Sequence, residues 1–97
     1  MAFVVVAIWK AKPGEEGRIR EIIGIMTRLS RQEAGNIHYQ AQVSLQDPTR
    51  FLLYEQYTSA KAYDDHKASE HFRKHVFGHA IHHLESREVS TYETIDV

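Results

Sequence analysis

The 97-residue sequence contains no cysteine. This absence excludes disulfides, zinc sites with thiolate ligands and cysteine nucleophiles, and it favours a reducing compartment, so we expect a cytoplasmic protein. The apolar run near the N-terminus is far shorter than the roughly 20 residues that a membrane-spanning helix needs. It also lacks the flanking pattern of a secretion signal. We therefore expect no association with a membrane.

A strong charge of either sign is also absent. The 12 Lys and Arg residues nearly balance the 13 Asp and Glu residues, and both kinds are scattered along the chain. Proteins that bind nucleic acid or anionic membranes usually carry a basic patch, so we expect neither partner. The length predicts one domain over residues 1–97. A domain this small buries only about two-thirds of its unfolded surface, so a partner subunit would add useful burial.

The order of apolar patterns predicts the elements of the fold. Residues 3–10 are β-branched or aromatic and apolar on both faces, which is typical of a strand that is covered on both sides. From Glu15 onward, apolar residues follow the spacing of one helical face. The predicted elements are a strand over 3–10, a helix from about 15 to 34, a hairpin of strands over 36–45 and 50–57, helices over 59–67 and 69–84, and a strand over 87–95.

This β-α-β-β-α(α)-β order predicts an α+β protein with a ferredoxin-like split βαβ fold and an antiparallel sheet. The helices then cover one face of the sheet only, although the first strand is apolar on both faces. We therefore expect a homodimer, a dimeric α+β barrel in which two sheets pack face to face. The alternative is a monomer whose sheet is half exposed to water.

Glu55 stands out within the second strand of the hairpin. Alternation places it on one face with Phe51, Leu53 and Tyr57. A buried carboxylate must find a hydrogen-bond donor or take up a proton. Glu55 is thus a candidate catalytic acid or base, or a partner that orients an imidazole. It is equally compatible with a structural glutamate bound to the backbone or to an arginine of a partner subunit.

His66 lies on the following short helix, on about the same side as Tyr63. An imidazole titrates near neutral pH and is the usual carrier of protons in catalysis, so His66 is a candidate general base. With seven histidines in the chain, a structural role is the more common alternative for any one of them.

Four further histidines form a stripe on the predicted helix 69–84, opposite its apolar side. Imidazoles at this spacing could bind zinc, but the stripe is expected to face water and lacks an HExxH motif. We therefore expect no functional metal site. The stripe consists of His71, His75, His79 and His82, and the apolar side of Phe72, Val76, Phe77, Ala80, Ile81 and Leu84.

Several aromatic residues could line a pocket between sheet and helices, although such residues mostly just form the core of a small domain. Asn36 follows Gly35 at the start of the second strand. It is either a turn residue or a side-chain donor at the end of such a pocket. No phosphate-binding glycine loop or nucleophile elbow is present in the sequence. Taken singly, these residues do not identify a reaction.

Together, however, three stretches resemble one family. The run GNIHY at 35–39, the run DPTRFLLYEQY at 47–57, and the spacing from Glu55 through His66 to SEHF at 69–72 are similar to the antibiotic biosynthesis monooxygenase-like (ABM) domain family. The resemblance covers nearly the whole chain. It implies a small dimeric ferredoxin-like α+β barrel.

The resemblance also implies a cofactor-independent monooxygenase that oxidises a small phenolic or quinol-type substrate with molecular oxygen. In this interpretation His66 is the base and Glu55 orients or charge-balances it. The substrate-binding residues are then Asn36, Tyr39, Tyr57, Tyr63 and Phe72.

Two alternatives remain open from the same resemblance. One is an isomerase of a small phosphorylated sugar-like signal of the autoinducer-2 type, which would use the same acid and base and would need basic residues such as Arg50 or Lys67 at the pocket mouth. The other is a non-catalytic dimer that binds a small ligand. The haem-degrading branch fits less well, because Ala7 and Trp9 occupy the first strand and position 66 is a histidine.

Overall fold

The computed structural model describes residues 1–95 and contains one four-stranded sheet with helices on one side. The helices α1 and α2 follow the first and third strands, and a set of short helical turns leads into the last strand. None of the helices among the described residues is long and apolar enough to cross a membrane. The elements are β1 (Phe3–Ala11), α1 (Glu16–Ser30), β2 (Asn36–Val43), β3 (Arg50–Tyr57), α2 (Ala60–Ala68), α3 (Glu70–Phe72), η1 (Arg73–Phe77), η2 (Ala80–His83) and β4 (Leu84–Glu93).

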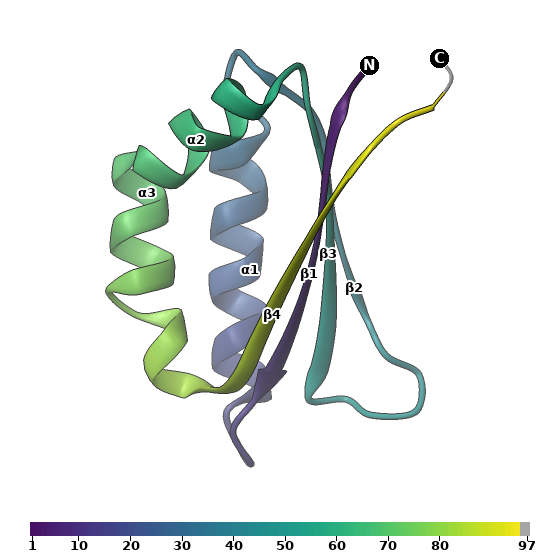
Figure 1. Ribbon diagram of the computed structural model, residues 1–97. Helices are drawn as coiled ribbons and strands as arrows, with labels where there is room; N and C mark the ends of the chain where they lie inside the picture. The colour runs from purple at the N-terminus through teal and green to yellow at the C-terminus, as the bar shows by residue number, and fades with distance from the viewer. Residues whose placement is uncertain (96–97) are drawn as a thin grey trace.

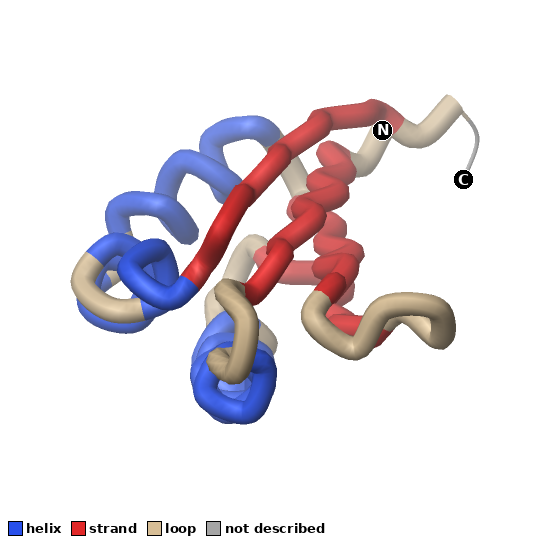
Figure 2. Tube along the Cα trace, turned by 90° about the horizontal axis from the view of Figure 1, so that it is seen from below, coloured by secondary structure: helices blue, strands red, loops and turns tan. Residues whose placement is uncertain are grey.

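The strands lie in the order β2-β3-β1-β4, and every neighbouring pair is antiparallel. This confirms the predicted ferredoxin-like α+β fold. The helices pack on one face of the sheet, and the opposite face carries no element of this chain (Figures 1 and 2). Strand β4 is an edge strand that crosses β1 at an angle, and most of its residues are exposed.

The core lies between α1 and the helix-facing side of the sheet. Alternate residues of β1 point into it, among them Ala7 and Trp9, and the predicted face of α1 meets them with Ile19 and Met26. The alternation predicted for β3 is also confirmed, because every second residue from Phe51 to Tyr57 is buried. The periodicity of apolar residues therefore predicted correctly which faces form the core.

The predicted helix over 69–84 is wrong as a single helix. Gly78 donates its backbone N–H to the carbonyl of Arg73, five residues back, which is the wide turn of a π-helix. A 3-10 turn follows over Ala80–His83. These changes of pitch rotate the later residues, so Phe77 and Ile81 are 49% and 38% exposed and do not join the core.

Other predicted boundaries also differ. Helix α1 ends at Ser30 and turns occupy the next five residues, so the helix is one turn shorter than the sequence indicated. Strand β2 ends at Val43, and its register shifts after Asn36. The shift breaks the alternation, which explains why Ile37 is exposed although it was predicted on the face of Tyr39. Strand β4 already begins at Leu84 and ends at Glu93.

Two serine caps fix the segment that carries His66. The Ser59 hydroxyl accepts a hydrogen bond from the Ala62 N–H, and the Ser69 hydroxyl accepts one from the Phe72 N–H. Such caps satisfy the free N–H groups at a helix start. They therefore define where α2 begins and where α3 turns away from it.

Gly35 sets how closely α2 approaches the start of β2. A Cβ atom at this position would lie 2.4 Å from the Cβ of Ala62, so only glycine fits. We expect Gly35→Ala to lower the free energy of unfolding by about 1–3 kcal/mol, because the helix must move away. Gly24→Ala is the matched control. Its Cβ would meet only the end of Arg28, at 3.9 Å, and helix propensity should raise stability by about 0.5–1 kcal/mol. Denaturant unfolding of both variants checks this pair, and equal effects would contradict it.

Candidate functional site

Glu55 lies on the helix-facing side of β3 and is 4% exposed. Its carboxylate accepts a hydrogen bond from the Tyr57 hydroxyl at 2.6 Å. Burial raises the pKa of Glu55, while the Tyr57 hydrogen bond and the charges of His66 and Arg87 oppose that rise. The strand thus holds a carboxyl group inside the protein that is easier to protonate than an ordinary glutamate.

His66 lies on α2 and is 2% exposed. Its Nδ1 atom is 2.8 Å and 3.1 Å from the two carboxylate oxygens of Glu33, and its Nε2 atom is 3.8 Å from Oε1 of Glu55. A carboxylate only accepts hydrogen bonds, so the proton of the neutral imidazole belongs on Nδ1 and the Nε2 lone pair is free. The ring is therefore set in the tautomer that a base at Nε2 requires.

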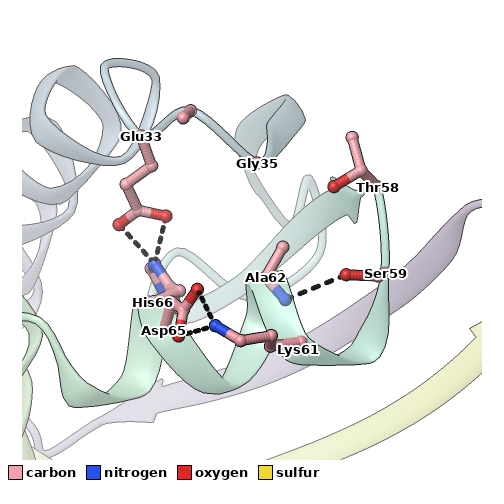
Figure 3. A pocket seen from close by; sticks show the side chains of 9 residues that line it. Glu33, Gly35, Thr58, Ser59, Lys61, Ala62, Asp65 and His66 are labelled. Atoms are coloured by element: carbon pink, nitrogen blue, oxygen red, sulfur yellow. Dashed lines mark hydrogen bonds and ion pairs between the residues drawn. The ribbon is translucent and has the colours of Figure 1, made fainter.

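Glu33 reaches this position from the turn between α1 and β2, and Figure 3 shows its carboxylate directed at the His66 ring. The same carboxylate accepts a hydrogen bond from Nε2 of His71, at 2.6 Å. Glu33 thus joins two imidazoles from the two ends of the α2–α3 corner.

The three residues Glu33, His66 and His71 could also hold a metal ion, because one ligand atom from each lies within 4.8 Å of the others. Two imidazoles and one carboxylate form a ligand set typical of transition metals. In the structure the carboxylate already bonds to both rings. The hydrogen bonds alone therefore account for the geometry, and we describe the group as a hydrogen-bonded cluster.

Aromatic rings enclose the imidazole of His66. The ring centres of Phe72, Tyr57, Tyr39 and Tyr63 lie 5.0, 5.3, 6.0 and 6.1 Å from that of His66. Burial raises the pKa of all three tyrosines, and the charge of Glu55 adds to the rise. These hydroxyls therefore stay protonated at neutral pH and can donate hydrogen bonds but cannot act as bases.

An inner cavity of about 10 Å³ lies on the Nε2 side of His66. This volume accommodates about one water molecule. Its wall includes most of the predicted site residues and one residue that the sequence analysis missed, Arg87. The lining residues are Val5, Ala7, Trp9, Tyr39, Leu53, Glu55, Tyr63, His66, Phe72, Val76, Arg87 and Val89.

A second, wider hollow of about 510 Å³ opens on the Nδ1 side of His66 (Figure 3). Glu33 and Gly35 form one wall, and Lys61 and Asp65 lie on the other, where they form an exposed ion pair. His66 lines both hollows. It therefore separates an open surface groove from the small enclosed cavity that contains the acid and the aromatic rings.

Asn36 does not join this group. Its side-chain N–H donates to the backbone carbonyl of His38, and it lines neither hollow. Asn36 pairs in register with Tyr57, but its side chain turns to the neighbouring His38 carbonyl. The structure thus brings together His66, Glu55, Tyr39, Tyr57, Tyr63 and Phe72, but not Asn36.

The histidine stripe differs from its predicted form. His71 is partly buried and turned toward Glu33, and His75 and His79 are half-buried beside α1. Of the four, His82 is exposed. The predicted stripe assumed one regular helix over 69–84. The structure instead has a short α-helix followed by a π turn, so the four histidines do not lie in one line.

The sequence analysis missed two residues of the site, Arg87 and Glu33, and they differ in the signal that the sequence contains for them. Arg87 lies two residues before Val89 on β4, so both side chains lie on the same face of the strand. The apolar Val89 thus indicates that Arg87 lies on the covered side. Glu33 left no such signal, because it lies in a turn where neither helical nor strand periodicity applies. Only the folded chain brings it to His66.

This architecture defines a small α+β protein of the ferredoxin-like class with a buried acid–imidazole pair. The family model of the antibiotic biosynthesis monooxygenases matches residues 1–76. The chain therefore belongs to the ABM family. No curated protein matches the sequence.

Solved structures repeat the fold over almost the whole chain. A protein from Shewanella oneidensis is 27% identical with a TM-score of 0.89, and the match covers 94% of this chain and 88% of that one. A proposed antibiotic biosynthesis monooxygenase from Nitrosomonas europaea is 25% identical with a TM-score of 0.92, covering 97% and 90%. A Mycobacterium tuberculosis protein, 22% identical, has a TM-score of 0.92 with coverages of 100% and 98%, and at this identity the likeness concerns the fold alone.

The raised pKa of Glu55 gives a stability test. Above the ordinary pKa of 4.5, the folded protein binds more protons at Glu55 than the unfolded chain does, so the free energy of unfolding falls as pH rises through that window. Glu55→Gln removes this dependence. We expect the stability of the variant relative to the wild type to increase between about pH 4 and pH 7. Urea unfolding at several pH values measures it, with the exposed Glu21→Gln as control. A difference that is constant with pH would contradict the shift.

Proposed function

We propose that the protein is a cofactor-independent monooxygenase that oxidises a small phenolic or quinol-type aromatic substrate with molecular oxygen. One observation carries the proposal: Glu33 holds Nδ1 of His66 while Nε2 faces Glu55 inside an aromatic cavity. A buried base with a free lone pair is what the first step of this chemistry needs. Membership of the ABM family supports a monooxygenase reaction.

The proposed reaction begins with the transfer of the phenolic proton to Nε2 of His66. The imidazolium that forms is stabilised by the Glu33 carboxylate at Nδ1 and by the nearby Glu55. The substrate anion is electron-rich enough to reduce dioxygen, which reacts slowly with the neutral phenol. One oxygen atom bonds to a ring carbon that loses its hydrogen and becomes a carbonyl, and the other leaves as water. The dry aromatic surroundings limit side reactions with solvent.

His66 is the residue on which the proposed reaction depends most. We expect His66→Gln to lower oxygen uptake with hydroquinones and naphthols about 10²–10⁴-fold, which is the usual contribution of a general base. An oxygen electrode measures the rate, and the loss of substrate in air is compared with its loss under argon. Near-UV circular dichroism checks that the variant is folded. His82→Ala, an exposed histidine of the same segment, is the matched control.

The outcomes separate the alternatives. Equal uptake by the wild type and His66→Gln would remove His66 from the mechanism. No uptake by the wild type, combined with isomerisation of a phosphorylated sugar-like compound, would replace the oxygenase with the isomerase. Of the basic residues first considered for phosphate, Arg50 is poorly placed, because it begins β3 at the end opposite Tyr57. Lys67 lies 4.5 Å from the ring centre of Tyr63, which lines the inner cavity.

The homodimer is the second part of this proposal. The sheet face away from the helices carries the apolar side chains of Val6, Ile8, Leu52 and Tyr54, which are only half-buried. No element of residues 1–95 covers this face. Packing against the same face of a second copy would bury both patches and satisfy the two-sided apolar pattern of β1.

The dimer can be tested at Leu52. We expect the wild type to sediment with twice the chain mass of 11.3 kDa, and Leu52→Glu to shift the equilibrium toward monomer, because a carboxylate would be buried at the interface. Leu45→Glu makes the same chemical change at a turn residue that is 94% exposed, and it should remain dimeric. Analytical ultracentrifugation gives the masses. A monomeric wild type would refute the dimer without affecting the proposed reaction.

A further inference from the structure

Arg87 extends from the edge strand β4 toward the helices. It pairs in register with Trp9, and its side chain lines the inner cavity together with Glu55 and His66. Its guanidinium carbon lies 5.9 Å from the ring centre of Phe72 on α3. The side chain therefore spans the gap between the sheet edge and the helices and closes the cavity on that side.

The Arg87 side chain is half-buried, and its Nε is buried without a hydrogen-bond partner. Within residues 1–95 no carboxylate forms an ion pair with it. Buried donors of this kind are nearly always satisfied. An acceptor supplied by a ligand would satisfy Arg87.

Glu55, the nearest candidate acceptor in the cavity wall, is engaged elsewhere. It accepts the hydrogen bond of Tyr57 and faces Nε2 of His66. The cavity thus contains a positive charge whose fork of N–H groups is not taken up by the carboxyl group beside it. Guanidinium groups bind carboxylates through two parallel hydrogen bonds, and such charge-assisted bonds are among the strongest in proteins.

The cavity volume also indicates where a ligand would enter. At about 10 Å³, the inner cavity is too small for an aromatic ring until one wall moves. Val89, which lines it from β4, is 39% exposed, so the wall is thin beside the edge strand. Among residues 1–95, Nε of Arg87 has no hydrogen-bond partner to hold it in that wall. A ligand that offers it an acceptor would move it outward.

We propose that Arg87 is an anion-binding residue and that the protein acts on hydroxyaryl acids, whose carboxylate binds Arg87 when the ring enters between β4 and α3. This inference rests on the proposed function for the location of the site and adds the substrate class. The carboxylate would orient the ring, so that the phenolic hydroxyl is presented to the buried base instead of to solvent.

Calorimetry under argon with 1-hydroxy-2-naphthoate and 1-naphthol, which differ by one carboxylate, tests the inference without turnover. We expect the wild type to bind the acid at least about 10-fold more tightly than the naphthol. Arg87→Met, which keeps the apolar stem, should weaken binding of the acid about 10- to 100-fold and leave the naphthol within about 2-fold. Arg87→Lys should retain part of the preference, because it keeps the charge but not the planar fork.

Arg50→Met is the matched control, because Arg50 is an exposed arginine at the start of β3, and it should bind both compounds as the wild type does. Equal binding of acid and naphthol by the wild type, an unchanged preference in Arg87→Met, or failure of the wild type to bind the acid would each overturn the inference. A carboxylate preference that requires Arg87, in a protein that consumes no oxygen, would support the inference and contradict only the oxygenase.

Discussion

The arrangement of the site depends on the hydrogen bond between the Glu33 carboxylate and Nδ1 of His66. A histidine that is 2% exposed must have its ring N–H satisfied, and the carboxylate does this while it determines which nitrogen keeps the proton. The other nitrogen is then free on the side of Glu55. The interaction joins the turn after α1 to α2, so the same contact that positions the base also connects two elements far apart in sequence.

Carboxyl groups flank the His66 ring at both of its nitrogens. Glu33 is partly exposed and shared with His71. Glu55 is more deeply buried, and burial raises its pKa. Two carboxyl groups with different environments thus flank one base, an arrangement that permits a proton to be accepted at Nε2 and stabilised from both sides. The tyrosines remain protonated and add hydrogen-bond donors without competing for that proton.

The two faces of the sheet differ in what covers them. Helices cover the side that carries Glu55, so the site is enclosed within one chain. The opposite side presents Val6, Ile8 and Leu52 without a covering layer. The proposed second subunit would add burial on that face, which a chain this short cannot supply from one core alone.

The sequence by itself determined the fold class, the strand alternation that buries Glu55 and the caps that begin α2 and α3. These follow from local rules: side chains alternate along a strand, apolar residues recur on one face of a helix, and a serine satisfies the first N–H groups of a helix. They placed Glu55 on the covered face of β3 and His66 on the side of α2 that carries Tyr63, whereas the resemblance to the family implied that the two act together. The same rules predicted one helix over 69–84. The structure has a short α-helix, a π turn and a 3-10 turn there instead, because periodicity does not specify a change of helical pitch.

Tertiary structure alone decided which residues contact Glu55 and His66. Glu33 lies 33 positions before His66 and comes from a turn, and Arg87 arrives from the last strand, so no spacing rule connects them to the site. Asn36 pairs in register with Tyr57, but its side chain bonds to the backbone carbonyl of His38 and not to the site, and no spacing rule indicates that choice. Periodicity specifies the face on which a residue lies. Contacts between elements depend on register, on close approaches such as that at Gly35, and on the angle at which helices meet the sheet, and these are set only when the whole chain packs.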